Sequence, residues 1–196
     1  MGIFVIYAVL PASWVATRND DLIFNQIGWW FPANMILNGI WLPTFQSNTT
    51  FGFIFAFIII CAMLTTTLVM AKRACNAELE VIEIICLRSA MSIYSGWLGA
   101  ATILSFSIML KVLGMTSAAG ATWGVTVLWI ALVMYGVNTY INMDPLFGGV
   151  FIWACCGIKS ENTNSMLETN LNAMIGIMSV YVGIIAAMAI YMKVKK

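Results

Sequence analysis

Long apolar runs, separated by short polar stretches, constrain the fold of this chain more than any other feature. A helix needs about 20 apolar residues to cross the hydrocarbon core of a bilayer. Lipid-exposed backbone must also satisfy its hydrogen bonds internally, which favours helices. Seven such runs can be recognised, at about 2–17, 22–44, 51–71, 78–113, 119–141, 146–158 and 171–192. We therefore predict an all-α, polytopic transmembrane helical bundle that forms a single domain over residues 1–196.

Two of these runs depart from the length of a simple crossing. The fourth, 78–113, is too long for the hydrocarbon core, so part of it is expected to tilt or to project into water. The sixth, 146–158, is short, and both a tilted crossing and a re-entrant segment are compatible with it.

The composition excludes a soluble protein. Hydrophobic residues make up 62% of the chain and charged residues only 9%, whereas a soluble domain carries about 25% charged residues. The surface must therefore face lipid, as in an integral membrane protein. A net charge of +1 without a basic face gives no sign of nucleic-acid binding.

The residue types of the chain limit the catalytic and metal-binding chemistry that it can perform. It contains no histidine, which removes imidazole metal ligands and the commonest general base. Its five cysteines are odd in number and lie mostly within apolar runs, so we interpret them as small buried residues. We predict no catalytic residue, no metal site and no cofactor.

The distribution of Lys and Arg predicts the orientation. With seven crossings, Lys111 and Lys159 lie on one side of the membrane. The other side is positive, because it holds Arg18, Lys72, Arg73, Arg88, Lys193, Lys195 and Lys196. The C-terminus is therefore expected on the positive side, in the matrix or the cytoplasm. The sequence leaves the membrane open, whether mitochondrial inner membrane, another organelle membrane or a bacterial one.

Polar and aromatic residues within the runs are candidates for packing or for ligand binding. Asn34 and Asn38 share one helix face, and Trp41 follows one turn later. Such amides join helices or contact a ligand, and both interpretations stay open. Trp97 and Trp153 lie near the centres of their runs, where an indole can line a cavity.

Small residues predict close helix contacts. Ser92, Gly96 and Ala100 repeat every four residues, and Gly120 and Gly124 form a second such pattern. Arg88 precedes the first stripe and is interpreted as an anchor to lipid headgroups, with a specific partner or ligand contact as the alternative. Asp144, followed by Pro145, is interpreted as a helix cap or turn residue.

Four stretches resemble the long form of the TspO-related family of tryptophan-rich sensory proteins. The stretch LRSAMSIYSGWLGAATILSF contains the core of a family motif in Ser92, Tyr94, Gly96 and Trp97. Three further stretches resemble family segments and follow the family's order along the chain. They are GIFVIYAVL, then IGWWFPANMILNGIWLPTF with Asn34, Asn38 and Trp41, and then DPLFGGVFIWACCGI with Gly148, Trp153 and Gly157. The resemblance covers about residues 2–158.

The chain departs from the family pattern in two places. The family has a further helix before the first of these stretches, so we expect either that this chain lacks the family's first helix or that the sequence is incomplete at its N-terminus. Ala90 and Met91 stand where the family motif has a proline. Both departures affect any ligand site that the family's first helix would close.

The resemblance implies a helical bundle that binds hydrophobic ligands and is not an enzyme. We expect first a structural or accessory subunit that packs against other membrane subunits or forms a homodimer. The alternative is a TspO-like binder of a tetrapyrrole, sterol or lipid. Its pocket would be lined by Asn34, Asn38, Trp41, Tyr94, Trp97 and Trp153. An enzyme or ion-coupled transporter is disfavoured, because no paired intramembrane carboxylates or inverted repeat is visible.

Overall fold

The computed structural model describes residues 27–76, 84–115, 117–161 and 164–194. Its helices are α2 (Trp30–Gln46), α3 (Thr50–Asn76), the π-helical turn η2 (Ile84–Arg88), α5 (Ser89–Val112), α6 (Ser117–Ile141), α7 (Pro145–Glu161) and α8 (Ser165–Val194). Within these ranges there is no strand, which confirms the all-helical class. The first predicted run, 2–17, lies outside the described residues, so the total of seven segments stays a prediction.

Four of the described helices are long and apolar enough to cross a membrane. These spans are Thr50–Ala74, Ser89–Val112, Thr122–Ile141 and Ser165–Met192. Helices α2 and α7 have 17 residues each. At 1.5 Å per residue they reach about 26 Å, slightly less than the hydrocarbon core of about 30 Å.

The fourth predicted run does not form one uninterrupted α-helix. A π-helical turn occupies Ile84–Arg88, and the regular α-helix α5 begins only at Ser89. The hydroxyl of Ser89 donates to the carbonyl oxygen of Ile84, five residues earlier, at 2.9 Å. A π-turn widens the helix locally and occurs often at functional sites. Here it places Arg88 directly before the membrane-spanning part of α5.

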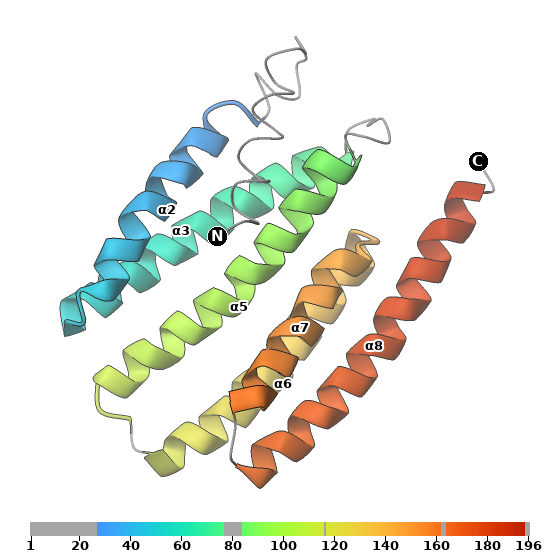
Figure 1. The fold of residues 1–196 in the computed structure, drawn as a ribbon. Helices are drawn as coiled ribbons and strands as arrows, with labels where there is room; N and C mark the ends of the chain where they lie inside the picture. Colours follow the sequence, from blue (N-terminus) through green and yellow to red (C-terminus); the bar gives the residue numbers. More distant parts are fainter. Residues whose placement is uncertain (1–26, 77–83, 116, 162–163, 195–196) are drawn as a thin grey trace.

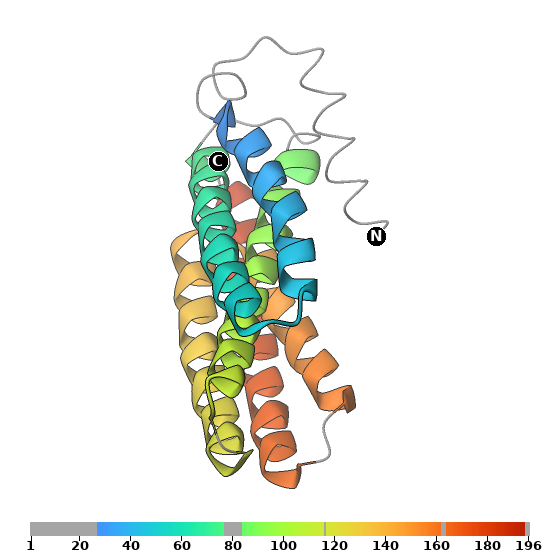
Figure 2. The same ribbon diagram turned by 90° about the vertical axis from the view of Figure 1, so that its left-hand side faces the viewer.

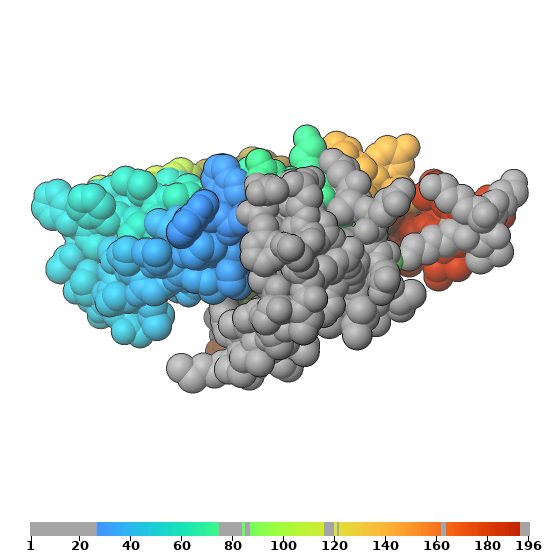
Figure 3. All heavy atoms as spheres, turned by 90° about the horizontal axis from the view of Figure 1, so that it is seen from above, coloured from blue at the N-terminus to red at the C-terminus, as the bar shows by residue number. Residues whose placement is uncertain are grey.

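Helix α5 lies between two groups of helices (Figures 1 and 2). On one side α3 packs against it and α2 packs on α3, whereas on the other side α7 packs against it and α6 and α8 complete the group. Successive helices run in opposite directions. Seen from above (Figure 3), α2 and α3 lie at one end of an elongated section and α8 lies at the other.

The two groups have separate apolar cores. Between α2, α3 and α5 the core contains Ile60, Met63 and Leu98, all 0% exposed. Between α6, α7 and α8 it is formed by a larger cluster that includes Phe151 and Met174. Because apolar clusters lie on both sides of α5, this helix must pack closely through two of its faces.

Small residues on α5 allow the second group to approach. A Cβ on Gly96 would lie 3.0 Å from Cβ of Val150 on α7. A Cβ on Gly99 would lie 2.9 Å from the hydroxyl oxygen of Tyr135 on α6. That same hydroxyl donates a hydrogen bond to the carbonyl oxygen of Gly96. The polar and small residues of α5 therefore serve contacts between helices.

Candidate functional site

Asn34 is the centre of a polar cluster between α2, α3 and α5. Its side chain is 0% exposed. Its Nδ2 lies 2.9 Å from the carbonyl oxygen of Met63, 2.7 Å from Oγ1 of Thr66 and 2.9 Å from Oγ1 of Thr67. Its Oδ1 accepts a hydrogen bond from the hydroxyl of Tyr94 at 3.0 Å. Because Nδ2 has two hydrogens for three acceptors, Asn34 has no donor left for another molecule.

Five of the six residues predicted to line a pocket come together here. Nδ2 of Asn38 donates to the hydroxyl of Tyr94 at 3.0 Å. The rings of Trp41 and Trp97 meet edge to face with centroids 6.5 Å apart. Trp153 does not join them, since it lies on α7 with 64% of its surface exposed. The hydrogen bonds of this cluster therefore connect three helices, α2, α3 and α5, and we call this set of contacts around Asn34 the polar joint.

The stripe that was predicted to pack helices is partly buried between α5 and α7. Ser92 is buried, and its hydroxyl donates to the carbonyl oxygen of Arg88 at 2.9 Å. Gly96 contacts Val150, and Ala100 is half-buried. By contrast, a Cβ on Gly120 or Gly124 would meet nothing within 4 Å. A close contact at these two glycines stays a prediction.

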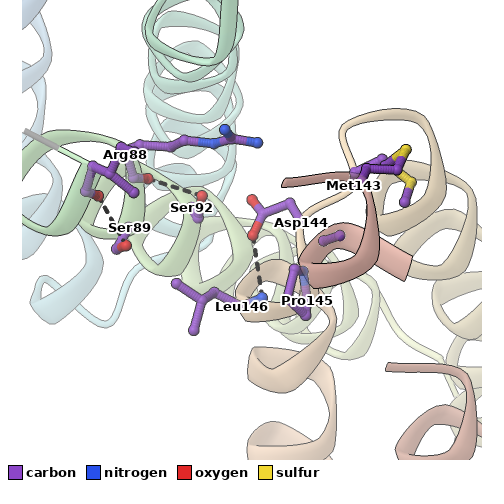
Figure 4. A pocket seen from close by; sticks show the side chains of 10 residues that line it. Arg88, Ser89, Ser92, Met143, Asp144, Pro145 and Leu146 are labelled. Atoms are coloured by element: carbon purple, nitrogen blue, oxygen red, sulfur yellow. Dashed lines mark hydrogen bonds between the residues drawn. The ribbon is translucent and has the colours of Figure 1, made fainter. Parts of the chain in front are cut away.

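A cavity of about 410 Å³ lies at the end of the bundle where α5 and α7 begin. Its polar lining comes from Arg88, Ser89, Ser92 and Asp144 (Figure 4). Its apolar lining comes from Ile84, Met143, Pro145, Leu146, Ala189 and Met192. Pockets for small molecules have volumes of about 300–1,000 Å³ and combine a mostly apolar lining with a few polar groups. This cavity has both properties.

Arg88 contributes the positive charge of the cavity. The π-turn places it immediately before α5, and it is half-buried. Within the described residues, one hydrogen bond forms from its guanidinium, from Nη2 to the carbonyl oxygen of Asn142 at 3.3 Å. A guanidinium has five N–H donors. Arg88 therefore has donors that no group in the described residues uses.

Asp144 contributes the negative charge from the opposite wall. It caps α7, because its Oδ1 accepts from the backbone N–H groups of Leu146 at 3.1 Å and Phe147 at 3.3 Å. This geometry agrees with the predicted helix cap, and Met143 before it turns the chain with a positive φ of 47°. No hydrogen bond to Oδ2 is formed within the described residues. Figure 4 shows the side chains of Arg88 and Asp144 approaching the same space from the residues directly before α5 and α7.

Sequence reasoning named Arg88 and Asp144 but did not place them together. It gave Arg88 a role at lipid headgroups and Asp144 a local role in a turn. It missed the contribution of Ala189 and Met192 from the end of α8, for which the sequence gives no signal. The lack of a metal site stays a prediction, although no group of three His, Cys, Asp or Glu side chains comes together in the described ranges.

Comparison with known proteins identifies one relationship. A family model described as "TSPO-like protein" matches residues 1–192. No curated protein and no solved structure matches the chain.

Proposed function

The chain belongs to the TSPO-like family of membrane proteins, and on that premise we propose that it is a non-catalytic binding protein that holds an amphiphilic ligand in the cavity beside Arg88 and Asp144. The observation that carries this proposal is the cavity itself, which combines charged and apolar walls. The family match covers nearly the whole chain and includes every segment that lines the cavity.

The position of the cavity along the helices favours an amphiphile. Three candidate spans end beside it, since Ser89 starts one, Ile141 ends the second and Met192 ends the third. We expect the boundary between hydrocarbon and headgroups to lie at these ends, because the spans between them have the length and composition of membrane helices. A molecule in the cavity would therefore have a polar part at headgroup depth and an apolar part along α5, α7 and α8.

A bulky side chain in the cavity tests the proposal. Ala189 is half-buried and lines the cavity, whereas Ala187, on the same helix, is exposed and does not line it. In native mass spectrometry of the purified full chain with a dioleoyl diacylglycerol or phospholipid, Ala189→Trp should lower ligand retention about tenfold. Ala187→Trp should retain as much ligand as the unmodified chain. Equal retention by both variants would exclude the cavity as the binding site.

The other ligand hypothesis places a tetrapyrrole or sterol at the polar cluster of Asn34, Asn38, Trp41, Tyr94 and Trp97, with Trp153. One observation favours it, because Nε1 of Trp41 is buried and meets no acceptor in the described part of the chain. The saturated hydrogen bonding of Asn34 favours a packing role instead. Quenching of tryptophan fluorescence by a porphyrin tests it, and this quenching should weaken in Asn38→Leu and in Trp97→Leu.

An accessory subunit or homodimer is the second candidate function. It is favoured by open glycine faces on α6 and α8, where a Cβ on Gly120, Gly124, Gly176 or Gly183 would meet nothing within 4 Å. The four-residue spacing of Gly120 and Gly124 allows a second helix to pack closely. In mass photometry of the detergent-solubilised protein, Gly124→Leu should reduce an assembled species. Gly149→Leu, at an equally open position on α7, is the matched control.

The charges at the helix ends support a proposed orientation in the membrane. Lys72 and Arg73 lie near the end of α3, and Arg88 lies at the start of α5. Lys111 and Lys159 lie in the last turns of α5 and α7, at the opposite end of the bundle. We infer that the cavity and the C-terminus face the positive side, the matrix or the cytoplasm. Accessibility of a cysteine introduced at the C-terminus tests this orientation in sealed vesicles.

A further inference from the structure

We propose that the cavity recognises the headgroup of a zwitterionic phospholipid with a primary ammonium group, its phosphate bound by Arg88 and its ammonium by Asp144. This inference rests on the proposed function, in which the cavity binds an amphiphile. It adds the chemical class of the ligand.

The guanidinium of Arg88 supplies the phosphate contact. One of its donors is used by the carbonyl oxygen of Asn142 within the described residues, and the remaining donors suit two phosphate oxygens at once. Ser89 and Ser92 line the same wall. Their hydroxyls donate to backbone carbonyls of Ile84 and Arg88, so they add polarity to this wall without adding charge.

Asp144 supplies the ammonium contact. Its side chain is only 8% exposed and is held in place by two backbone N–H groups of α7 at Oδ1. No donor in the described part of the chain reaches Oδ2. A fixed carboxylate whose second oxygen has no donor within the described residues is suited to accept a hydrogen bond from an ammonium group.

The two charges together select the ligand. Arg88, at the end of η2, and Asp144, directly before α7, line one cavity and form no ion pair with each other within the described residues. The phosphate of a purely anionic headgroup would pair with Arg88 but would leave the carboxylate of Asp144 without a cationic partner, which is unfavourable in a partly buried site. A zwitterion pairs with both residues.

The nature of the lining also distinguishes between ammonium groups. Quaternary ammonium groups are recognised by aromatic rings, and none of the ten lining residues is aromatic. A primary ammonium carries N–H donors that a carboxylate can accept. The cavity therefore suits an ethanolamine headgroup better than a choline headgroup.

Lipid binding to the purified full chain tests this assignment. After removal of lipid in a neutral detergent, dioleoyl phosphatidylethanolamine, phosphatidylglycerol, phosphatidylcholine and diacylglycerol are compared by native mass spectrometry. Phosphatidylethanolamine should bind about fivefold more tightly than phosphatidylglycerol or phosphatidylcholine, as expected for one additional charge contact. Equal or tighter binding of phosphatidylglycerol by the unmodified protein would overturn the proposal.

Variants assign the two contacts. Asp144→Asn keeps an oxygen that can cap α7 and removes the charge, so it should remove the preference for phosphatidylethanolamine over phosphatidylglycerol. Arg88→Gln should weaken both lipids. Lys111→Gln, exposed at the other end of α5, is the control and should change neither. A preference that persists in Asp144→Asn would also overturn the proposal, and Asp144→Ser serves the same purpose if Asp144→Asn does not fold.

The failure of this inference differs from failure of the proposed function. If every lipid binds equally but Ala189→Trp abolishes binding, the cavity is an amphiphile site without headgroup selection. If Ala189→Trp changes the binding of no lipid, both proposals are wrong.

Discussion

The hydroxyl of Tyr94 on α5 donates a hydrogen bond to Oδ1 of Asn34 on α2 at 3.0 Å. Asn34 in turn reaches the backbone carbonyl of Met63 on α3. One hydroxyl and one amide thus connect three helices of a bundle in which lipid supplies no hydrophobic driving force between helices. The residues that carry the family resemblance are therefore also residues of the polar joint.

The hydrogen bonds around Asn34 predict that replacing Asn34 and replacing Asn38 lower the free energy of unfolding by different amounts. Asn34→Leu removes the hydrogen bonds of the amide to Met63, Thr66, Thr67 and Tyr94 and should lower the free energy of unfolding by about 1–3 kcal/mol. Asn38→Leu removes one bond, to Tyr94, and should cost about 0.6 kcal/mol. Denaturation by SDS, followed by circular dichroism, measures both values. The interpretation is wrong if Asn38→Leu costs as much as Asn34→Leu.

Neighbouring glycines of α7 should respond in opposite ways to alanine. A Cβ on Gly148 would lie 2.7 Å from Cγ2 of Val182, 2.8 Å from Oγ1 of Thr139 and 2.9 Å from Cε of Met178. Gly148→Ala should therefore destabilise the protein by about 1–3 kcal/mol through overpacking.

Gly149→Ala is the matched control for this prediction. A Cβ at Gly149 meets nothing within 4 Å, and alanine favours the helix by about 0.5–1 kcal/mol. It should leave the thermal unfolding temperature in detergent unchanged or raise it. A loss as large as that of Gly148→Ala would contradict the packing of α7 against α6 and α8.

Helix faces explain how much of the structure the sequence could predict. Asn34, Asn38 and Tyr94 lie on faces that periodicity and the family motif both indicate, and these three residues meet. Trp153 lies apart, because Phe147, Val150 and Phe151 form the buried stripe of α7 and Trp153 falls outside it. A helix of 17 residues that is apolar on every side hides this distinction from sequence reasoning.

The cavity could not be predicted for a different reason. It depends on a π-turn at Ile84–Arg88, a turn at Met143 and the end of α8, which are brought together only by tertiary packing. Apolar periodicity does not predict how neighbouring helices are aligned along their axes. It also does not predict a π-turn, in which one helical turn contains an extra residue. The individual charges of Arg88 and Asp144 were visible in the sequence, but their common location was not.

The hydroxyl groups of Thr139 and Thr67, two fully buried residues, should contribute differently to the free energy of unfolding. Oγ1 of Thr139 has no hydrogen-bond partner within the described residues, and its side chain is 0% exposed. Replacing an unpaired buried hydroxyl with a methyl group removes a desolvation penalty. Thr139→Val should therefore leave the free energy of unfolding unchanged or raise it by up to about 1 kcal/mol.

Thr67 provides the comparison for Thr139. Its Oγ1 donates to the carbonyl oxygen of Met63 at 2.8 Å and accepts from Asn34 at 2.9 Å. Thr67→Val should lower the free energy of unfolding by about 0.5–1.5 kcal/mol. Chemical denaturation of the two variants in the same detergent decides the point, and a reversed order would contradict it.

The cap of α7 predicts that charge and stability can be separated at Asp144. Oδ1 satisfies the N–H groups of Leu146 and Phe147, so Asp144→Ala should lower the free energy of unfolding by about 0.5–2 kcal/mol. Asp144→Asn retains a capping oxygen and should remain within about 0.5 kcal/mol of the original protein. Denaturation of lipid-free protein measures both values, because bound lipid would add its own stabilisation. If Asp144→Asn loses as much stability as Asp144→Ala, the charge and not the cap sustains the fold at this position.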